Sequence, residues 1–79
     1  MAKRGKLEIM RDILKIILEN KNRIKPNPLL RKSGLSSDRF KEYYFELLKK
    51  KLIREINENP KKHIILTEKG FFSLKDINQ

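Results

Sequence analysis

The side chains of this sequence that could do chemistry are mostly cationic, and they occur in groups. Lysine and arginine number 20 against 10 acids, which gives a formal net charge of +10. Residues 21–34 contain bases but no acid, and further basic groups lie at 1–6, 49–51 and 61–62. Clustered cations attract polyanions because they raise the local positive potential. A uniformly solvated lysine-rich surface is the alternative, but the acid-free segment favours polyanion binding.

Residues that would serve an enzyme are nearly absent. Cysteine is missing, His63 is the single histidine, and the sequence has no glycine-rich phosphate loop or nucleophile–base pairing. We therefore expect no enzyme activity, no cofactor and no metal site. The longest aliphatic runs are three residues, whereas a membrane-spanning helix needs about twenty. We expect a soluble, cytoplasmic protein without membrane contact.

Apolar residues at helical spacing predict a first helix over residues 6–20. Its apolar face is formed by Met10, Ile13, Leu14, Ile17 and Leu18. Two further isoleucines widen this face beyond what a one-sided surface helix requires. The helix should therefore lie at the centre of the core or share a second contact. The length predicts one domain, residues 1–79, with 1–5 as a flexible basic tail.

Two more helices, joined by a glycine turn, are predicted in the middle of the chain. Asn27 is a preferred N-cap and Pro28 a preferred first residue, which predicts a short helix over 28–33. Gly34 can adopt the positive φ that ends a helix. Ser36 is expected to cap a helix over 37–50, whose apolar stripe is Phe40, Tyr43, Tyr44, Leu47 and Leu48.

The last part of the sequence predicts a hairpin followed by a helix. Residues 52–56 and 63–66 have the pattern of strands, and turn-forming residues occupy 57–62. Thr67 is expected to cap a final helix that ends near Ile77. The predicted fold is α+β and mainly α: a winged helix-turn-helix with three helices, a two-stranded wing and a short C-terminal helix. Such a unit places its recognition helix in the DNA major groove and its wing on phosphates.

Four segments resemble the small archaeal winged helix-turn-helix proteins, which are basic DNA-binding proteins of crenarchaea and of their plasmids and viruses. The segments are 6–14 (KLEIMRDIL), 38–43 (DRFKEY), 47–53 (LLKKKLI) and 66–70 (LTEKG). The similarity covers about residues 6–75. It implies a winged-helix fold, double-stranded DNA as the ligand, and a role as a transcription regulator or chromatin-associated protein.

Three features depart from that family. Many members have glycine where Lys51 stands, so Lys51 must adopt a positive φ or the helix must end differently. Phe71 and Phe72 stand where a charge is more usual. Chromatin-type members continue into a long helix that pairs as an antiparallel coiled coil, for which this chain is too short. We expect a homodimer through Phe71 and Phe72 or through the first helix, or equally a monomer.

The start of helix 37–50 is where a recognition helix usually meets base edges. The candidates for base contact are Ser37, Arg39, Lys41, Glu42 and Phe45. Arginine commonly binds guanine, and a carboxylate can accept from the cytosine amino group. Phe45 falls off the apolar stripe, where it would meet a sugar, a thymine methyl or a protein partner. A solvated face, with Arg39 paired to an acid, is the alternative.

The candidates for phosphate contact come from the tail, the first two helices, the recognition helix and the wing. They are Lys3, Arg4, Lys6, Lys25, Arg31, Lys32, Lys49, Lys61, Lys62 and His63. Phosphate contacts fix the position of a protein on the duplex without reading its sequence. The alternative for Lys61 and Lys62 is that they are ordinary turn lysines, and for His63 a structural role.

Two other functions stay open. One is a winged helix used for protein contact in a transcription or assembly machine, which the exposed aromatic residues Phe45, Phe71 and Phe72 would support. The other is a small basic RNA-binding protein. Competition between duplex DNA and hairpin RNA would separate these, because a protruding helix fits the major groove of B-form but not of A-form duplexes.

Overall fold

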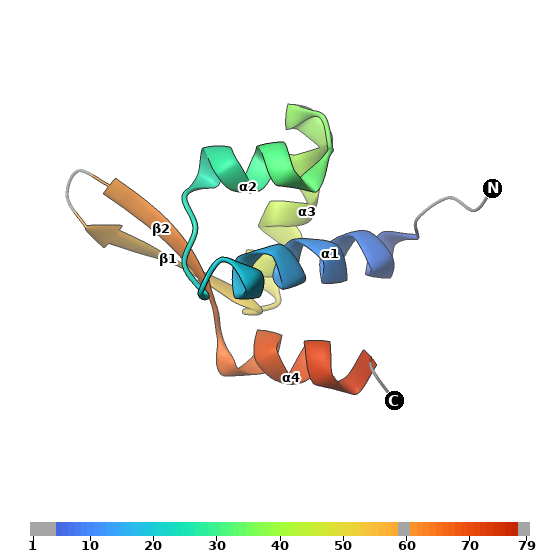
Figure 1. Cartoon of the computed structure of the whole chain (residues 1–79). Helices are drawn as coiled ribbons and strands as arrows, with labels where there is room; N and C mark the ends of the chain where they lie inside the picture. The colour runs from blue at the N-terminus through green and yellow to red at the C-terminus, as the bar shows by residue number, and fades with distance from the viewer. Residues whose placement is uncertain (1–4, 59–60, 78–79) are drawn as a thin grey trace.

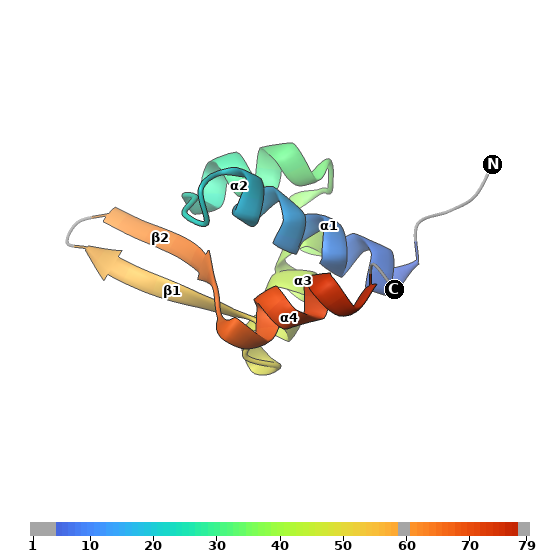
Figure 2. The same ribbon diagram turned by 60° about the horizontal axis from the view of Figure 1, so that its bottom comes forward.

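The computed structural model describes residues 5–58 and 61–77, with side chains to residue 74. Its elements are α1 (Lys6–Glu19), α2 (Pro26–Ser33), α3 (Ser37–Lys49), β1 (Ile53–Glu58), β2 (Lys61–Leu66) and α4 (Glu68–Ile77). The order confirms the predicted α+β, mainly helical winged helix-turn-helix. Figure 1 shows α1 between α2 and α4, and Figure 2 shows the hairpin projecting from the helical body. Of the predicted tail and turn, residues 1–4 and 59–60 lie outside the described residues.

The core is built around α1. Ile9, Met10, Ile13, Leu14 and Ile17 are all buried on this helix. The wide apolar face is explained by its neighbours, since α1 contacts α2, α3, β2 and α4. The remaining core side chains come from α2, α3, the two strands and the connections, and the half-buried Leu74 of α4 packs against them, so that burial of α1 holds the whole domain together.

The turn between α2 and α3 follows the prediction at Gly34, which has a φ of 74°. Ser36 caps α3 as expected, because its hydroxyl accepts from the Arg39 N–H at 3.4 Å. The start of α2 was predicted wrongly: Lys25 is the N-cap and Pro26 the first residue. Pro26 and Pro28 both have the fixed φ that suits a first turn, so the first of the two prolines already begins the helix.

The exit from α3 confirms the expectation for Lys51, whose φ is 62°. The Leu52 N–H donates to the Leu47 carbonyl at 2.9 Å, and the Lys51 N–H to the Leu48 carbonyl at 3.0 Å. This pair of bonds is the Schellman termination, which normally has glycine at the left-handed position. A side chain in that conformation costs about 1–2 kcal/mol.

The hairpin strands are longer than predicted, and the assignment of residues 57–62 to a turn was wrong at its two ends. The antiparallel register pairs Asn57 with Lys62 and Glu58 with Lys61. Backbone pairing and the opposite charges of Glu58 and Lys61 outweigh the low strand propensity of these residues. The base of the hairpin is joined to the α1–α2 connection by a bridge between Ile24 and Ile64, with N···O distances of 3.1 and 2.7 Å.

The start of α4 is fixed against the end of α3. The Thr67 hydroxyl accepts from the Gly70 N–H at 3.1 Å, which confirms the predicted cap, and donates to the Lys51 carbonyl at 2.6 Å. Gly70 is buried, and a Cβ at that position would lie 2.1 Å from the Leu52 carbonyl oxygen. Only glycine therefore allows this approach of α4 to the α3–β1 junction.

Candidate nucleic-acid interface

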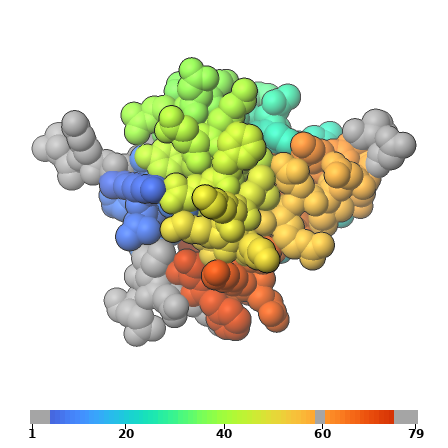
Figure 3. Space-filling model, turned by 180° about the vertical axis from the view of Figure 1, so that it is seen from behind, coloured from blue at the N-terminus to red at the C-terminus, as the bar shows by residue number. Residues whose placement is uncertain are grey.

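The helix α3 and the hairpin lie side by side on one face of the molecule. In the space-filling view of Figure 3, α3 crosses the centre of this face and the hairpin extends to its right. Helix α2 borders the face above and α4 below. The element that would enter a groove and the element that would lie on the backbone can therefore meet one surface together.

The predicted base-contacting side chains all belong to exposed residues of α3. They are Ser37, Arg39, Lys41, Glu42 and Phe45. Residues 41, 45 and 49 follow one another at four-residue intervals and so lie along one line of the helix. Phe45 is 63% exposed, although its ring lies 6.2 Å from that of Tyr44. Its exposure confirms that it does not belong to the apolar stripe.

The acids of α3 differ in how far they are compensated. Glu46 lies 2.9 Å from the Lys6 ammonium and 3.6 Å from that of Lys50. The hydrogen bond from Lys6 is the main cause that lowers the pKa of Glu46. Asp38 and Glu42 are exposed and form no ion pair among the described side chains, 5–58 and 61–74. Of the predicted phosphate contacts, Lys6 is thus engaged by an acid of the recognition helix itself.

The acids of β1 are paired inside the protein. Glu55 accepts from the Tyr44 hydroxyl, and its carboxylate lies 3.7 Å from the Lys62 ammonium. Burial of Tyr44, together with this carboxylate, raises the pKa of Tyr44 well above its usual value. Glu58 accepts from the Arg23 guanidinium. The negative charges of the strand are therefore partly neutralised, and the surplus charge of the wing stays positive.

His63 is less accessible than the lysines of the wing. Its side chain is 14% exposed, and its Nδ1 lies 3.4 Å from Glu58 Oε1, without the geometry of a hydrogen bond. Lys61 and Lys62 precede it and are exposed. The ring of His63 therefore faces the other strand at Glu58, while the side chains of Lys61 and Lys62 are accessible to solvent, that of Lys62 beside Glu55.

The first turn of α2 lies next to the wing. Lys25, the 26–28 segment, Lys61 and Lys62 together line a hollow of about 330 Å³. Arg31 and Lys32 are exposed in the last turn of α2, and Lys49 is exposed near the end of α3. Lys3 and Arg4 lie outside the described residues. The fold thus brings together Lys25 and the two wing lysines, which are far apart in the sequence.

Several residues that shape this surface were not predicted. Arg23 and Tyr44 bind the acids of β1 across different elements, and no local pattern predicts such a pair. Lys51 and Arg54, also exposed, line a hollow with Lys69 at the edge of β1. Their place on the surface depends on how α4 packs, which spacing along the sequence does not determine.

No group of three metal-ligating side chains occurs in the part of the chain that the structure describes. None of the helices it contains is long and apolar enough to cross a membrane.

Comparison with known proteins gives one family. Neither a curated protein nor a solved structure matches this sequence. Residues 3–79 match the sequence model described as winged helix-turn-helix, which spans nearly the whole chain and every element of the fold. The helix pair joined at Gly34 and the hairpin after α3 are the two parts that give such proteins their name. The chain belongs to the winged helix-turn-helix family.

Proposed function

We propose that this protein binds double-stranded DNA, with the recognition helix 37–50 in the major groove and the wing, residues 57–62, on the phosphate backbone. The observation that carries the proposal is the common face of α3 and the hairpin, with exposed cations on both. A protein that binds cellular DNA would lie at the nucleoid in the cytoplasm. There it would act as a transcription regulator or a chromatin-associated protein. The quoted segments also support a place among the small archaeal members of the family.

Base reading is assigned to the exposed side chains at the start and middle of α3. Arg39 suits a guanine edge, Glu42 a cytosine amino group, and Phe45 a thymine methyl. Ser37 and Lys41 complete this set. The exposure of all five residues supports the assignment, and the unpaired acids Asp38 and Glu42 would keep backbone phosphates away from this part of the helix.

Backbone contact is assigned to the cations that surround α3. The wing lysines Lys61 and Lys62 and the α2 residue Lys25 line one hollow, where a phosphate group would meet three ammonium groups. Arg31, Lys32 and Lys49 are exposed as well. The proposed secondary contacts are Lys3, Arg4, Lys6 and His63. Lys6 forms an ion pair with Glu46 in the free protein and would exchange this carboxylate for a phosphate on binding.

The experiment is a titration of a labelled 20-base-pair duplex with the full chain over a range of salt concentrations. If about five phosphates are neutralised, the slope of log K against log salt should be near −4.5. Hairpin RNA of equal length is the competitor and should bind more weakly. A flat salt dependence would refute DNA binding, and stronger binding to the RNA would assign the protein to RNA instead.

A protein-contact role is the second candidate, and the exposure of Phe71 and Phe72, 46% and 59%, is the observation that favours it. A pull-down partner combined with no measurable DNA affinity would select it. The same two residues or α1 would form a homodimer, and a monomer is equally compatible with the fold. Sedimentation of the DNA complex decides between these, and selection from random duplexes would show symmetric half-sites for a dimer.

A further inference from the structure

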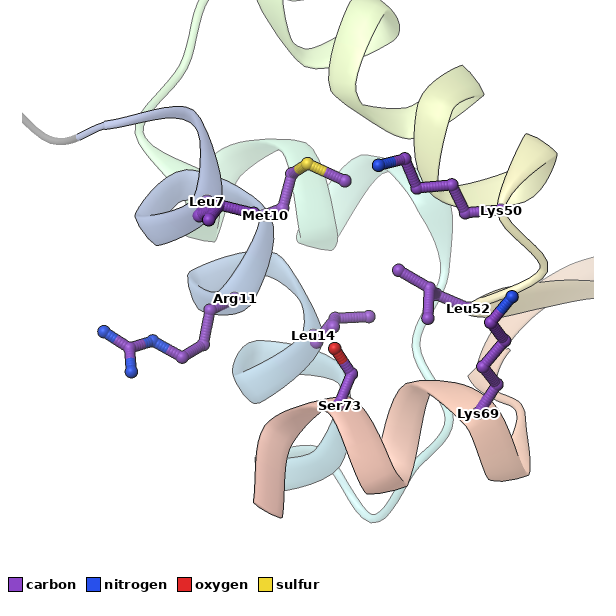
Figure 4. Close-up of a pocket in the computed structure, with 8 residues that line it drawn as sticks. All are labelled: Leu7, Met10, Arg11, Leu14, Lys50, Leu52, Lys69 and Ser73. Carbon is purple, nitrogen blue, oxygen red and sulfur yellow. The ribbon is translucent and has the colours of Figure 1, made fainter. Parts of the chain in front are cut away.

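A cavity of about 450 Å³ opens between α1, α4 and the junction of α3 with β1 (Figure 4). Its floor is apolar and consists of Met10, Leu14 and Leu52, which are 4%, 1% and 8% exposed. The exposed side chain of Leu7 extends this apolar surface at the start of α1. A cavity of this size is within the range that holds small organic ligands, and its floor would bind an apolar body.

Cationic and hydroxyl groups surround this floor. In Figure 4 the side chain of Lys50 reaches toward Met10, that of Lys69 rises beside Leu52, and the Ser73 hydroxyl points toward Leu14. Lys69 takes part in no ion pair among the described side chains, 5–58 and 61–74, whereas Lys50 lies 3.6 Å from Glu46. An ammonium group beside an apolar floor attracts an anion more strongly than one in bulk water, because the local dielectric constant is lower.

The rim as a whole is positive. Arg11 lines the cavity too, although its guanidinium points away from the floor. Among the side chains that the structure describes, the one acid that pairs with a lining residue is Glu46, and Lys6 shares its charge at 2.9 Å. A cationic ligand would therefore be repelled, while a simple anion such as phosphate would leave the apolar floor exposed to water.

We propose that this cavity binds a small amphipathic carboxylate, whose apolar body covers Met10, Leu14 and Leu52 and whose carboxylate pairs with Lys69 and accepts from Ser73. The assignment is independent of DNA binding. Apart from Lys50, the last residue of the proposed recognition helix, the lining of the cavity lies outside the proposed groove and backbone contacts.

The test is a titration of the full chain, without DNA, followed by amide chemical shifts in NMR spectra. The probe is naphthalene-2-carboxylate. Its matched controls are 2-(aminomethyl)naphthalene, which carries the opposite charge, and acetate, which lacks the apolar body. We expect the carboxylate to bind with a dissociation constant near or below about 1 mM and to shift the amides of Met10, Leu14, Leu52, Lys69 and Ser73. Neither control should do so at equal concentration.

Variants at the rim distinguish specific binding in the cavity from non-specific binding elsewhere on the surface. Lys69→Gln should weaken the binding of the carboxylate roughly fivefold, which is the upper range for an exposed ion pair. Lys69→Arg should retain most of the affinity. Lys21→Gln removes the same charge at an exposed position outside the cavity and should change nothing.

Each of three results would overturn the proposal. They are equal binding of the amine, shifts scattered outside the cavity, and unchanged affinity in Lys69→Gln. Concentration-dependent shifts of the cavity amides in the ligand-free protein, together with a dimer on sedimentation, would assign the cavity to a second copy of the chain. If the protein proves not to bind DNA, the outcome of this titration is unaffected, because no DNA is present in the assay.

Discussion

Replacement of Gly70 by alanine tests the contact between α4 and the α3–β1 junction. Helix propensity alone predicts that alanine stabilises α4 by about 1 kcal/mol. The new Cβ, however, would lie 2.1 Å from the Leu52 carbonyl oxygen, which is a backbone atom and also accepts from the Thr67 N–H at 3.1 Å. Overpacking of this kind costs typically 1–3 kcal/mol, and so short a distance places it at about 3 kcal/mol. The expected net loss is about 2 kcal/mol.

The assay is urea unfolding followed by circular dichroism, with a thermal scan of the same samples. A loss of about 2 kcal/mol in a domain of this size lowers Tm by about 10 °C. Ser73→Ala, a substitution later in α4 that adds no atom to the side chain, is the control and should leave stability nearly unchanged. If Gly70→Ala is as stable as the parent or more so, the close approach of α4 to Leu52 is wrong.

Three more predictions follow from the surface and from the end of α3. Lys61→Gln with Lys62→Gln should weaken binding to every duplex alike and reduce the steepness of the salt slope by about 1.5 to 2. Lys51→Gly should raise the free energy of unfolding by about 0.5 kcal/mol, and with it the urea midpoint. The reason is that the strain of a positive φ exceeds the entropy cost of glycine. Glu46 has a lowered pKa in the folded state, so its contribution to stability is present above the ordinary carboxylate pKa and is lost as pH falls through the lowered value. Lys6→Gln should raise the pKa of Glu46 in a carboxyl NMR titration and flatten the acid side of the stability profile from about pH 6 downward.

Each of these has a control and an opposing result. For the wing, Lys21→Gln should leave the salt slope unchanged, and a loss confined to one DNA sequence would make the wing lysines base readers. For the helix end, Lys50→Gly, at a φ of −81°, should destabilise by about 0.5–1 kcal/mol, and a loss of stability in the Lys51 variant would refute the strain. For the acid, an unchanged pKa of Glu46 in the Lys6→Gln variant would show that Lys6 does not lower this pKa.

Features that depend on neighbouring residues were predictable from the sequence. Ser36 and Thr67 cap the helices that follow them, and Gly34 adopts the left-handed conformation. The positive φ of Lys51 was one of two alternatives that the resemblance implied, because many members of that family have glycine at this position. The start of α2 was missed by two residues, because Pro26 and Pro28 offer competing first turns and the local signal does not rank them.

Features that depend on packing between elements could not be predicted. The extension of the strands through Glu58 and Lys61 needs cross-strand pairing, which outweighs local turn propensity. The hydrogen bond from the Tyr44 hydroxyl to Glu55 joins α3 to β1. The need for glycine at position 70 arises only when α4 approaches Leu52. The exposure of the five proposed base-contacting residues on α3 follows from helical spacing and so was open to prediction.

The bridge between Ile24 and Ile64 determines how the hairpin can open. The amide of Ile64 is held by the α1–α2 connection, and the nearby Leu66 amide donates to the Asn22 side chain at 2.8 Å. Beyond Ile64, toward the tip, no third segment pairs with the backbone of the ladder within the described residues, and the tether there is the exposed ion pair of Arg23 with Glu58. Fraying should therefore begin at the tip and stop at Ile64, so that deuterium uptake divides the hairpin into a quickly exchanging outer half and a protected root that opens only with the core.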